Sequence, residues 1–243
     1  MAASLSPTPA IRAAPCDVIL ALDVPSRAEA EAFLTRIGPD LRWVKIGLQM
    51  FVREGPGIVD AIAARGHKIF LDLKFHDIPN TVASAIRSLR GRPCDLLTLH
   101  AAGGREMMLQ AISAARETNP GLRLLAVTAL TSMDDAALVE TGVPGGAAAQ
   151  VERLAALAFG AGVPGLICSP VELPALRAKF GREPLLITPG VRPVGADAGD
   201  QKRTMTPREA AAAGADLIVV GRPLLRADDP RAALAAIRAE MNV

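Results

Sequence analysis

The sequence predicts a single-domain (β/α)8 TIM barrel, an α/β fold in which parallel strands alternate with helices around a closed ring. Short apolar, β-branched runs alternate eight times with longer amphipathic stretches, the pattern of parallel strands that are buried on both faces and joined by helices. The 243 residues also match the usual size of one barrel. An open doubly wound sheet is the alternative, but GxGxxG normally follows its first strand, and DVPS stands at residues 23–26 instead.

The barrel domain is expected to span residues 16–243. Its strands are predicted, in chain order, at residues 18–22, 43–46, 68–73, 96–99, 122–128, 165–168, 185–188 and 217–220. Each strand is followed by a predicted helix, at residues 26–37, 51–65, 81–89, 105–118, 147–160, 173–180, 207–213 and 230–241. The Pro/Gly-rich residues 141–146 are interpreted as a loop inside the fifth unit.

Several helix boundaries are marked by residues with known capping preferences. Ser26, with Glu29 three residues later, predicts a capping box at the first helix. Proline favours the first turn of a helix, which suits Pro207 and Pro230. Glycines stand where three of the helices should end, at Gly66, Gly181 and Gly214.

The composition gives no support to a nucleic-acid or membrane partner. The net charge of +2, with no Tyr, one Trp and six Phe, provides neither a broad cationic face nor a base-stacking platform. No apolar run approaches the roughly 18 residues that cross a bilayer. Residues 1–15 are rich in Ala, Ser and Pro with one arginine, which favours a disordered tail over a transit peptide.

The cysteines indicate a reducing compartment. Cys16, Cys94 and Cys168 are odd in number, widely spaced and without a CxxC pair. Such usage favours reduced, packed thiols over disulfides or a structural zinc site. We therefore expect a cytoplasmic protein.

Charged residues stand where the first three predicted strands end. In a barrel this edge carries the active site. Because side chains alternate along a strand, Asp72 and Lys74 share one face, and the outer face must meet helices. We therefore expect both to point into the barrel mouth. Ionised groups there cost several kcal/mol each to desolvate, so a catalytic role is favoured over the alternative of an interior ion pair.

Lysines and aspartates also alternate in sign in this set. Two ammonium groups about 4 Å apart repel by roughly 4 kcal/mol at an effective dielectric of 20, and interleaved carboxylates would cancel that repulsion. Lys45, Asp72, Lys74 and Asp77 have the composition for such a chain. Neighbouring carboxylates favour the protonated lysine, which suits an acid better than a Schiff-base nucleophile.

A phosphate site is predicted after strands seven and eight, where barrels commonly bind phosphate. Residues 188–192 read TPGVR, and Gly221 precedes Arg222. Glycine lets backbone N–H groups approach phosphate oxygens, and the planar guanidinium matches them. Ordinary turns with solvated arginines are the alternative. Small residues at 195–199 suit a loop that closes over a ligand, or else a disordered connector.

These motifs resemble the signature of the orotidine 5'-phosphate decarboxylase family. The resemblance rests on DxKxxD at residues 72–77, preceded by LALD at 20–23 and VKIG at 44–47. It extends over about residues 16–240 through LTLHAAGG at 97–104, LTSM at 130–133, TPGVRP at 188–193, GDQKR at 199–203 and GADLIVVGRPL at 214–224. It implies conversion of orotidine 5'-phosphate to UMP and CO2, the last step of de novo pyrimidine biosynthesis.

The resemblance also implies the role of each site residue. Lys74 would stabilise and then protonate the C6 carbanion, Asp72 would lie near the departing carboxylate, and Lys45 and Asp77 would orient the array. The substrate-binding residues that it implies are Asp23, Lys45, Thr81, Thr131, Ser132, Pro189, Arg192, Gln201, Gly221 and Arg222. No metal or other cofactor is expected, because the lysine supplies the electrostatic stabilisation.

The partners implied by the resemblance are the substrate and a second copy of the chain. Asp77 and Thr81 would enter the neighbouring subunit's site, so an obligate homodimer with two shared sites is expected. The length leaves no room for a fused phosphoribosyltransferase.

Two other functions remain open at this stage. A magnesium-dependent sugar-phosphate decarboxylase or aldolase of the same superfamily would also carry DxKxxD, but the resemblance implies a glutamate there in place of Lys45. A catalytically silent nucleotide-binding barrel is the second. Three aromatic residues are given structural interpretations: His76 at the dimer interface or in packing, His100 as a hydrogen-bonded residue of the barrel rim, and Trp43 between barrel and helices.

Overall fold

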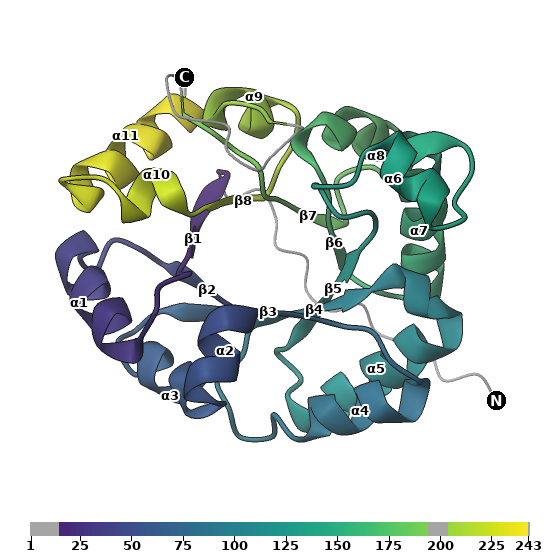
Figure 1. Ribbon diagram of the computed structural model, residues 1–243, viewed down its shortest axis with the longest axis horizontal. Helices are drawn as coiled ribbons and strands as arrows, with labels where there is room; N and C mark the ends of the chain where they lie inside the picture. Colours follow the sequence, from purple (N-terminus) through teal and green to yellow (C-terminus); the bar gives the residue numbers. More distant parts are fainter. Residues whose placement is uncertain (1–14, 194–203, 243) are drawn as a thin grey trace.

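The computed structural model describes residues 15–193 and 204–242, which form a closed barrel of eight parallel strands. Each strand pairs with its neighbours in chain order, and β1 closes the ring against β8. Figure 1 shows the strands as an inner ring with the helices outside it. The predicted fold class is confirmed.

All eight predicted strands are present. They are β1 (Asp17–Ala21), β2 (Trp43–Gly47), β3 (Lys68–Phe75), β4 (Leu96–His100), β5 (Arg123–Val127), β6 (Gly165–Ile167), β7 (Leu185–Thr188) and β8 (Leu217–Val220). The α-helices of the described residues are α1 (Arg27–Ile37), α2 (Leu48–Glu54), α3 (Gly57–Ala63), α4 (Pro79–Arg87), α5 (Gly104–Thr118), α6 (Asp135–Glu140), α7 (Gly146–Ala161), α8 (Leu173–Phe180), α9 (Pro207–Ala212), α10 (Arg222–Leu225) and α11 (Pro230–Met241). Short 3-10 turns, η1 (Ala101–Gly103) and η2 (Pro170–Glu172), precede α5 and α8.

The prediction of one helix over residues 51–65 is wrong. Gly55 adopts a φ of +69° and ends α2, and Pro56 then precedes α3. A left-handed glycine followed by proline stops a helix, because the proline has no N–H to continue the hydrogen-bond ladder. The short α6 and α10 were also not predicted.

The capping predictions are confirmed in part. Pro207 and Pro230 open α9 and α11, as expected. The Ser26 hydroxyl accepts the Glu29 N–H at 3.3 Å. The Glu29 carboxylate accepts a hydrogen bond from that hydroxyl rather than from the Ser26 backbone N–H, so the capping box is incomplete. A complete capping box instead forms between Thr206 and Glu209 at the start of α9.

The core has two layers, separated by the strands. Outward side chains pack beneath the helices in one large cluster, and inward side chains fill the barrel in a smaller one. Trp43 belongs to the inner cluster with Ile19 and Phe70, so its expected place between barrel and helices is wrong. The alternation explains this, because Trp43 lies two residues before Lys45, whose ammonium points inward to Asp72.

The amino ends of the strands are fixed by three aspartates, each of which accepts one backbone N–H at a strand start. Asp17 accepts from Val18, Asp95 from Ile69 and Asp216 from Leu186, at 2.8, 2.9 and 2.7 Å. Each is also paired with a cation: Asp17 with Arg238 at 2.8 Å, Asp95 with Lys68 at 3.4 Å and Asp216 with Arg177 at 2.6 Å.

His67 also lies at this end, just before β3. Its Nδ1 is 2.8 Å from the Leu41 carbonyl oxygen and its ring is buried. Burial lowers the pKa of His67 below its usual value, although the contact with Leu41 opposes the shift. The ring therefore acts as a neutral N–H donor in the fold.

Three further predictions concern the cysteines, membrane-spanning helices and the N-terminal tail. The described cysteines form no disulfide, and burial raises the pKa of Cys94 to about 12, which agrees with a packing role. None of the helices within residues 15–193 and 204–242 is long and apolar enough to cross a bilayer. The expected tail lies, except for residue 15, outside the described residues.

Candidate active site

The carboxyl ends of β1, β2 and β3 bring four of the predicted side chains into one row of alternating charge. The Lys45 ammonium lies 3.2 Å from Asp23 Oδ1 and 3.6 Å from Asp72 Oδ2. The other oxygen of Asp72, Oδ1, lies 2.8 Å from Lys74 Nζ. The order of charges is thus Asp23, Lys45, Asp72, Lys74, which we call the charged row.

Strand register places the row. Lys45 of β2 lies beside Ala21 of β1 and Phe70 of β3, and Gly47 pairs with Asp72. A Cβ atom on Gly47 would lie 2.9 Å from both Asp23 Oδ1 and Lys45 Nζ. A Cβ there would force the Asp23 or Lys45 side chain to shift, so glycine leaves room for the first ion pair of the row as it stands.

The backbone of Lys74 is strained. Its φ is +50°, and it is the only non-glycine residue with a positive φ within residues 15–193 and 204–242. Such a conformation costs on the order of 1–2 kcal/mol for an L-residue and persists only where surrounding contacts enforce it. The strain at Lys74 therefore distinguishes it from the other charged residues of the row.

The electrostatics keep the centre of the row ionised. Burial is the largest single influence on Asp72 and would raise its pKa, but the positive charges of Lys45 and Lys74 and the hydrogen bonds from Lys74 and Thr98 together outweigh it. The pKa of Asp72 therefore lies below its usual value. Lys45 is itself only 8% exposed, so its ammonium depends on the two carboxylates for its stability.

Two histidines stack beside the row, at the ends of β3 and β4. The ring centroids of His76 and His100 are 5.3 Å apart. Burial lowers the pKa of His100, and the positive charges of His76 and Lys74 add to that effect. The expected hydrogen bond of His100 is not formed within the described part of the chain, where its ring packs against His76 instead.

Asp77 and Thr81 lie outside the row. Both are exposed, and Asp77 Oδ1 accepts the N–H of Ile78 at 2.7 Å. Within residues 15–193 and 204–242, Asp77 makes no ion pair with either lysine. A single chain therefore does not join the second aspartate of DxKxxD to the first.

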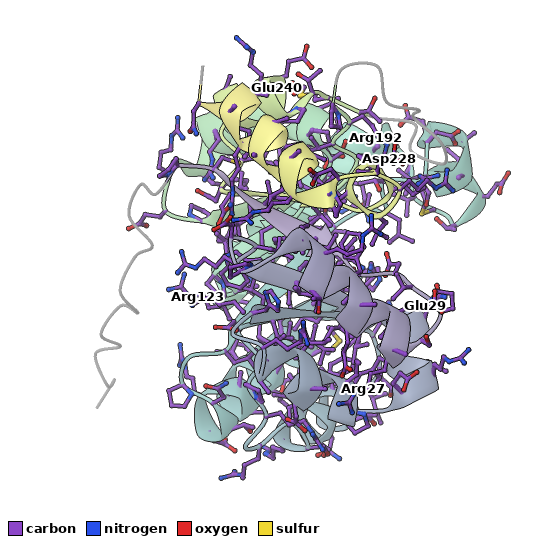
Figure 2. The ribbon with its side chains drawn as sticks, turned by 90° about the vertical axis from the view of Figure 1, so that its left-hand side faces the viewer. Arg27, Glu29, Arg123, Arg192, Asp228 and Glu240 are labelled. Atoms are coloured by element: carbon purple, nitrogen blue, oxygen red, sulfur yellow. The ribbon has the colours of Figure 1, made fainter. Side chains whose placement is uncertain are left out.

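The predicted phosphate residues follow β7 and β8 on the same rim. The backbone N–H of Arg192 donates to Met205 O at 2.9 Å, and its guanidinium donates to Val191 O. Arg222 is the first residue of α10, directly after Gly221. In the side view of Figure 2, Arg192 lies on the opposite side of the molecule from Arg123, which begins β5 at the amino ends of the strands.

The other predicted binding residues are less closely defined. Pro189 is partly buried after β7, whereas Thr131 and Ser132 occupy a turn after β5 in which the Met133 N–H donates to Leu130 O at 2.9 Å. Gln201 and the small residues 195–199 lie outside the described residues. No group of three or more His, Cys, Asp or Glu side chains within residues 15–193 and 204–242 is arranged to hold a metal ion.

Sequence reasoning missed Thr98, whose hydroxyl contacts both Asp72 and Lys74. It donates to Asp72 Oδ1 at 3.0 Å and accepts the backbone N–H of Lys74 at 2.9 Å. A signal was present, because Thr98 is the polar residue in the run LLTL and alternates with the inward Leu96. An inward hydroxyl near the carboxyl end of a barrel strand can therefore indicate a site residue, as a charged side chain does.

Fold and site together define the class of protein: a (β/α)8-barrel enzyme with a lysine–aspartate row at the carboxyl ends of its strands. Comparison with known proteins then identifies the family. Residues 17–237 match the family described as "Orotidine 5'-phosphate decarboxylase / HUMPS family", and the chain belongs to it.

Individual relatives cover nearly the whole chain. The orotidine 5'-phosphate decarboxylase of Anaeromyxobacter sp. (strain K) is 54% identical over 222 residues, which is 91% of this chain and 96% of that protein. That of Opitutus terrae is 50% identical, covering 93% and 99%. The crystal structure of orotidine 5'-phosphate decarboxylase from Lactobacillus acidophilus has a TM-score of 0.84 at 37% identity, covering 94% of this chain and all of that one.

Proposed function

We propose that this protein decarboxylates orotidine 5'-phosphate to UMP and CO2, the last step of de novo pyrimidine biosynthesis. The observation that carries the proposal is the charged row, in which Asp72 joins the ammonium groups of Lys45 and Lys74 at 3.6 and 2.8 Å. Membership of the family, with curated relatives about half identical, supports it. Cysteine usage without disulfides, at Cys16, Cys94 and Cys168, favours a cytoplasmic location.

The reaction needs an electrostatic catalyst. When the bond between C6 and the carboxylate breaks, CO2 leaves and the electron pair stays in an in-plane orbital at C6, out of reach of the ring π system. A fixed ammonium can stabilise that charge and then transfer its proton to form the C6–H bond. We assign both tasks to Lys74, whose amine regains a proton from water after product release.

The remaining members of the row have supporting tasks in this proposal. Asp72 lies against Lys74 and would face the substrate carboxylate, where like charges raise the energy of the ground state. Lys45 and Asp77 orient the array, and Asp23 and Lys45 contact the ribose hydroxyls. The neutral His100 leaves the proton transfer to the lysine.

Substrate binding is assigned to residues on the same rim. Thr131 and Ser132 would contact the pyrimidine, and the phosphate would be held by Arg192, Gln201, Gly221 and Arg222, with Pro189 as a further substrate-binding residue. A Cβ at Gly221 would lie 3.3 Å from the Cβ of Ala21, so close packing against β1 also favours glycine at this position. Binding energy from the distant phosphate can then raise turnover as well as affinity.

We also propose a homodimer with shared sites, in which Asp77 and Thr81 reach the neighbouring subunit. The exposure of Asp77 and the lack of an ion pair to it from its own lysines support this, within the described residues. Next to it in the chain, Ile78 exposes 68% of its surface.

The activity is tested by following the loss of orotidine 5'-phosphate absorbance in the presence of EDTA. We expect turnover to continue, because the row uses lysine charges in place of a metal ion. A magnesium-dependent sugar-phosphate enzyme of the same family would stop in EDTA and act on a sugar phosphate instead. A protein that binds the nucleotide without ever converting it would contradict the proposal.

Site sharing is tested by mixing two inactive homodimers. Asp72→Ala and Asp77→Ala should each lose nearly all turnover, because each lacks one end of the shared array. Random exchange of subunits should restore roughly a quarter of the wild-type sites, since half of the dimers then carry one intact site. If exchange is verified by mass and no activity returns, the sites are not shared.

A further inference from the structure

Among the described residues, Thr98 is the uncharged side chain that links the backbone and the charges of the row. It lies in β4 with no exposed surface. Its hydroxyl has one proton to donate, and an ionised carboxylate can only accept, so that proton goes to Asp72 Oδ1 at 3.0 Å. Its lone pairs accept the backbone N–H of Lys74 at 2.9 Å. The hydroxyl therefore acts within the site both as a donor and as an acceptor.

The pairing of β3 with β4 explains why a hydroxyl is needed. Leu71 pairs with Leu97 and Phe75 with Leu99, so three residues of β3 face the single residue Thr98. In a regular ladder the N–H of an even-numbered residue of β3 points toward β2, as that of Lys68 does to Arg42 O at 2.8 Å, and the bulge instead turns the Lys74 N–H toward β4. The threonine side chain accepts it there and so supports the left-handed backbone of Lys74.

The same hydroxyl fixes the orientation of the Asp72 carboxylate. Oδ1 receives the Thr98 hydroxyl and the Lys74 ammonium, which leaves Oδ2 turned toward Lys45 at 3.6 Å. Thr98, Asp72 and Lys74 thus close a ring that runs from the lysine N–H to its own Nζ. Rotation of the carboxylate would break contacts to both of the other members.

We propose that Thr98 is a positioning residue that holds the Lys74 ammonium and the Asp72 carboxylate in their reactive arrangement. The proposal rests on the proposed function, because it concerns the rate of that decarboxylation. Among the described residues, the Thr98 hydroxyl donates to Asp72 rather than to a predicted phosphate or ribose residue. Its loss should therefore lower kcat and leave KM nearly unchanged.

The test compares Thr98→Val with Thr98→Ser. Valine keeps the shape but loses the hydroxyl, which leaves the Lys74 N–H and Asp72 Oδ1 without this partner. A hydrogen bond to a charged group corresponds to about a 10- to 100-fold effect, so kcat should fall by that factor. Serine keeps the hydroxyl and should retain kcat within about threefold.

Thr128→Val is the matched control. Thr128 is a buried threonine just after β5 whose hydroxyl has no hydrogen-bond partner within the described residues. The same substitution there should leave kcat within about twofold of wild type. Amide hydrogen exchange at Lys74 adds a readout without substrate, since its N–H should exchange faster in Thr98→Val alone.

The outcomes separate this proposal from the proposed function. A wild-type protein that fails to convert orotidine 5'-phosphate overturns the function itself. An active wild type with normal kcat in Thr98→Val overturns only the positioning role. Equal losses in the valine and serine variants, or a change confined to KM, would also overturn it.

Discussion

The two ends of the barrel carry similar charges but use them differently. At the amino ends, Asp17, Asp95 and Asp216 each pair with one cation and accept one strand N–H. At the carboxyl ends, Asp72 is shared between two lysines, and its other hydrogen bond comes from a side chain. Backbone groups thus anchor the first set, whereas the second set is held mainly by its own members.

The difference indicates which charges serve the fold and which serve chemistry. A carboxylate that accepts a backbone N–H satisfies a group that must be paired for the strand to form. The charged row satisfies few such groups and instead maintains a buried ammonium and a strained lysine backbone. Exchanging a residue at one end should therefore change stability, and at the other end it should change turnover.

The largest effect is expected for Lys74→Ala at the carboxyl end. Turnover of orotidine 5'-phosphate should fall by at least about 10³-fold, because the variant loses both the charge that stabilises C6 and the proton donor. Stability should change by less than about 1 kcal/mol, since the ammonium is part of a partly exposed pair. Steady-state kinetics and urea unfolding measure the two quantities. Near-normal turnover would remove Lys74 from the mechanism.

A smaller effect is expected for Asp216→Ala at the amino end, and it should lower stability rather than turnover. The change removes the acceptor of the Leu186 N–H and the partner of the nearly buried Arg177, so the protein should lose about 2–3 kcal/mol of stability. The folded enzyme should keep kcat/KM within about twofold. Urea unfolding beside kinetics at low temperature provides the check. A selective loss of turnover would show that the two ends are not independent.

The smallest expected effect is a loss of stability at acid pH. The pKa values of His67 and His100 are lowered in the folded protein, so the unfolded chain takes up protons first as the pH falls below 6.5. Stability should therefore decrease from neutral pH into the acid range. The lowered pKa of Asp72 adds a second loss below its ordinary value of 3.8, because its ionised form stabilises the fold only above its folded pKa.

His67→Asn assigns part of that pH dependence to the amino end. Asparagine keeps a donor for the Leu41 carbonyl but does not titrate. The slope of unfolding free energy against pH between 7 and 5 should become shallower than in wild type. An unchanged slope would mean that His67 does not contribute to it.

Much of the barrel follows from local patterns in the sequence. Short apolar runs and helix caps depend on neighbouring residues, and alternation along one strand relates Asp72 to Lys74 without knowledge of the fold. The prediction of one helix over residues 51–65 failed because the amphipathic pattern continues across Gly55 and Pro56. The break between α2 and α3 depends only on these two residues.

The features that the sequence did not reveal depend on how strands are aligned with one another. The position of Thr98 opposite the bulge follows from the register of β3 with β4, and no single strand contains that information. The same holds for the stacking of His76 on His100. The proposed partner of Asp77 lies on another copy of the chain, so the structure of a single chain shows only that Asp77 is exposed.

The bulge that faces Thr98 has a consequence for protein engineering. A designer who copies the lysines and aspartates of this row onto another barrel would obtain an ordinary β3 and a lysine with a relaxed backbone. The ammonium would then leave the strand at a different angle, even with every charged residue in place. The transferable unit is therefore the irregular strand together with its threonine neighbour, and a graft that keeps only the charges should bind ligand without turning it over.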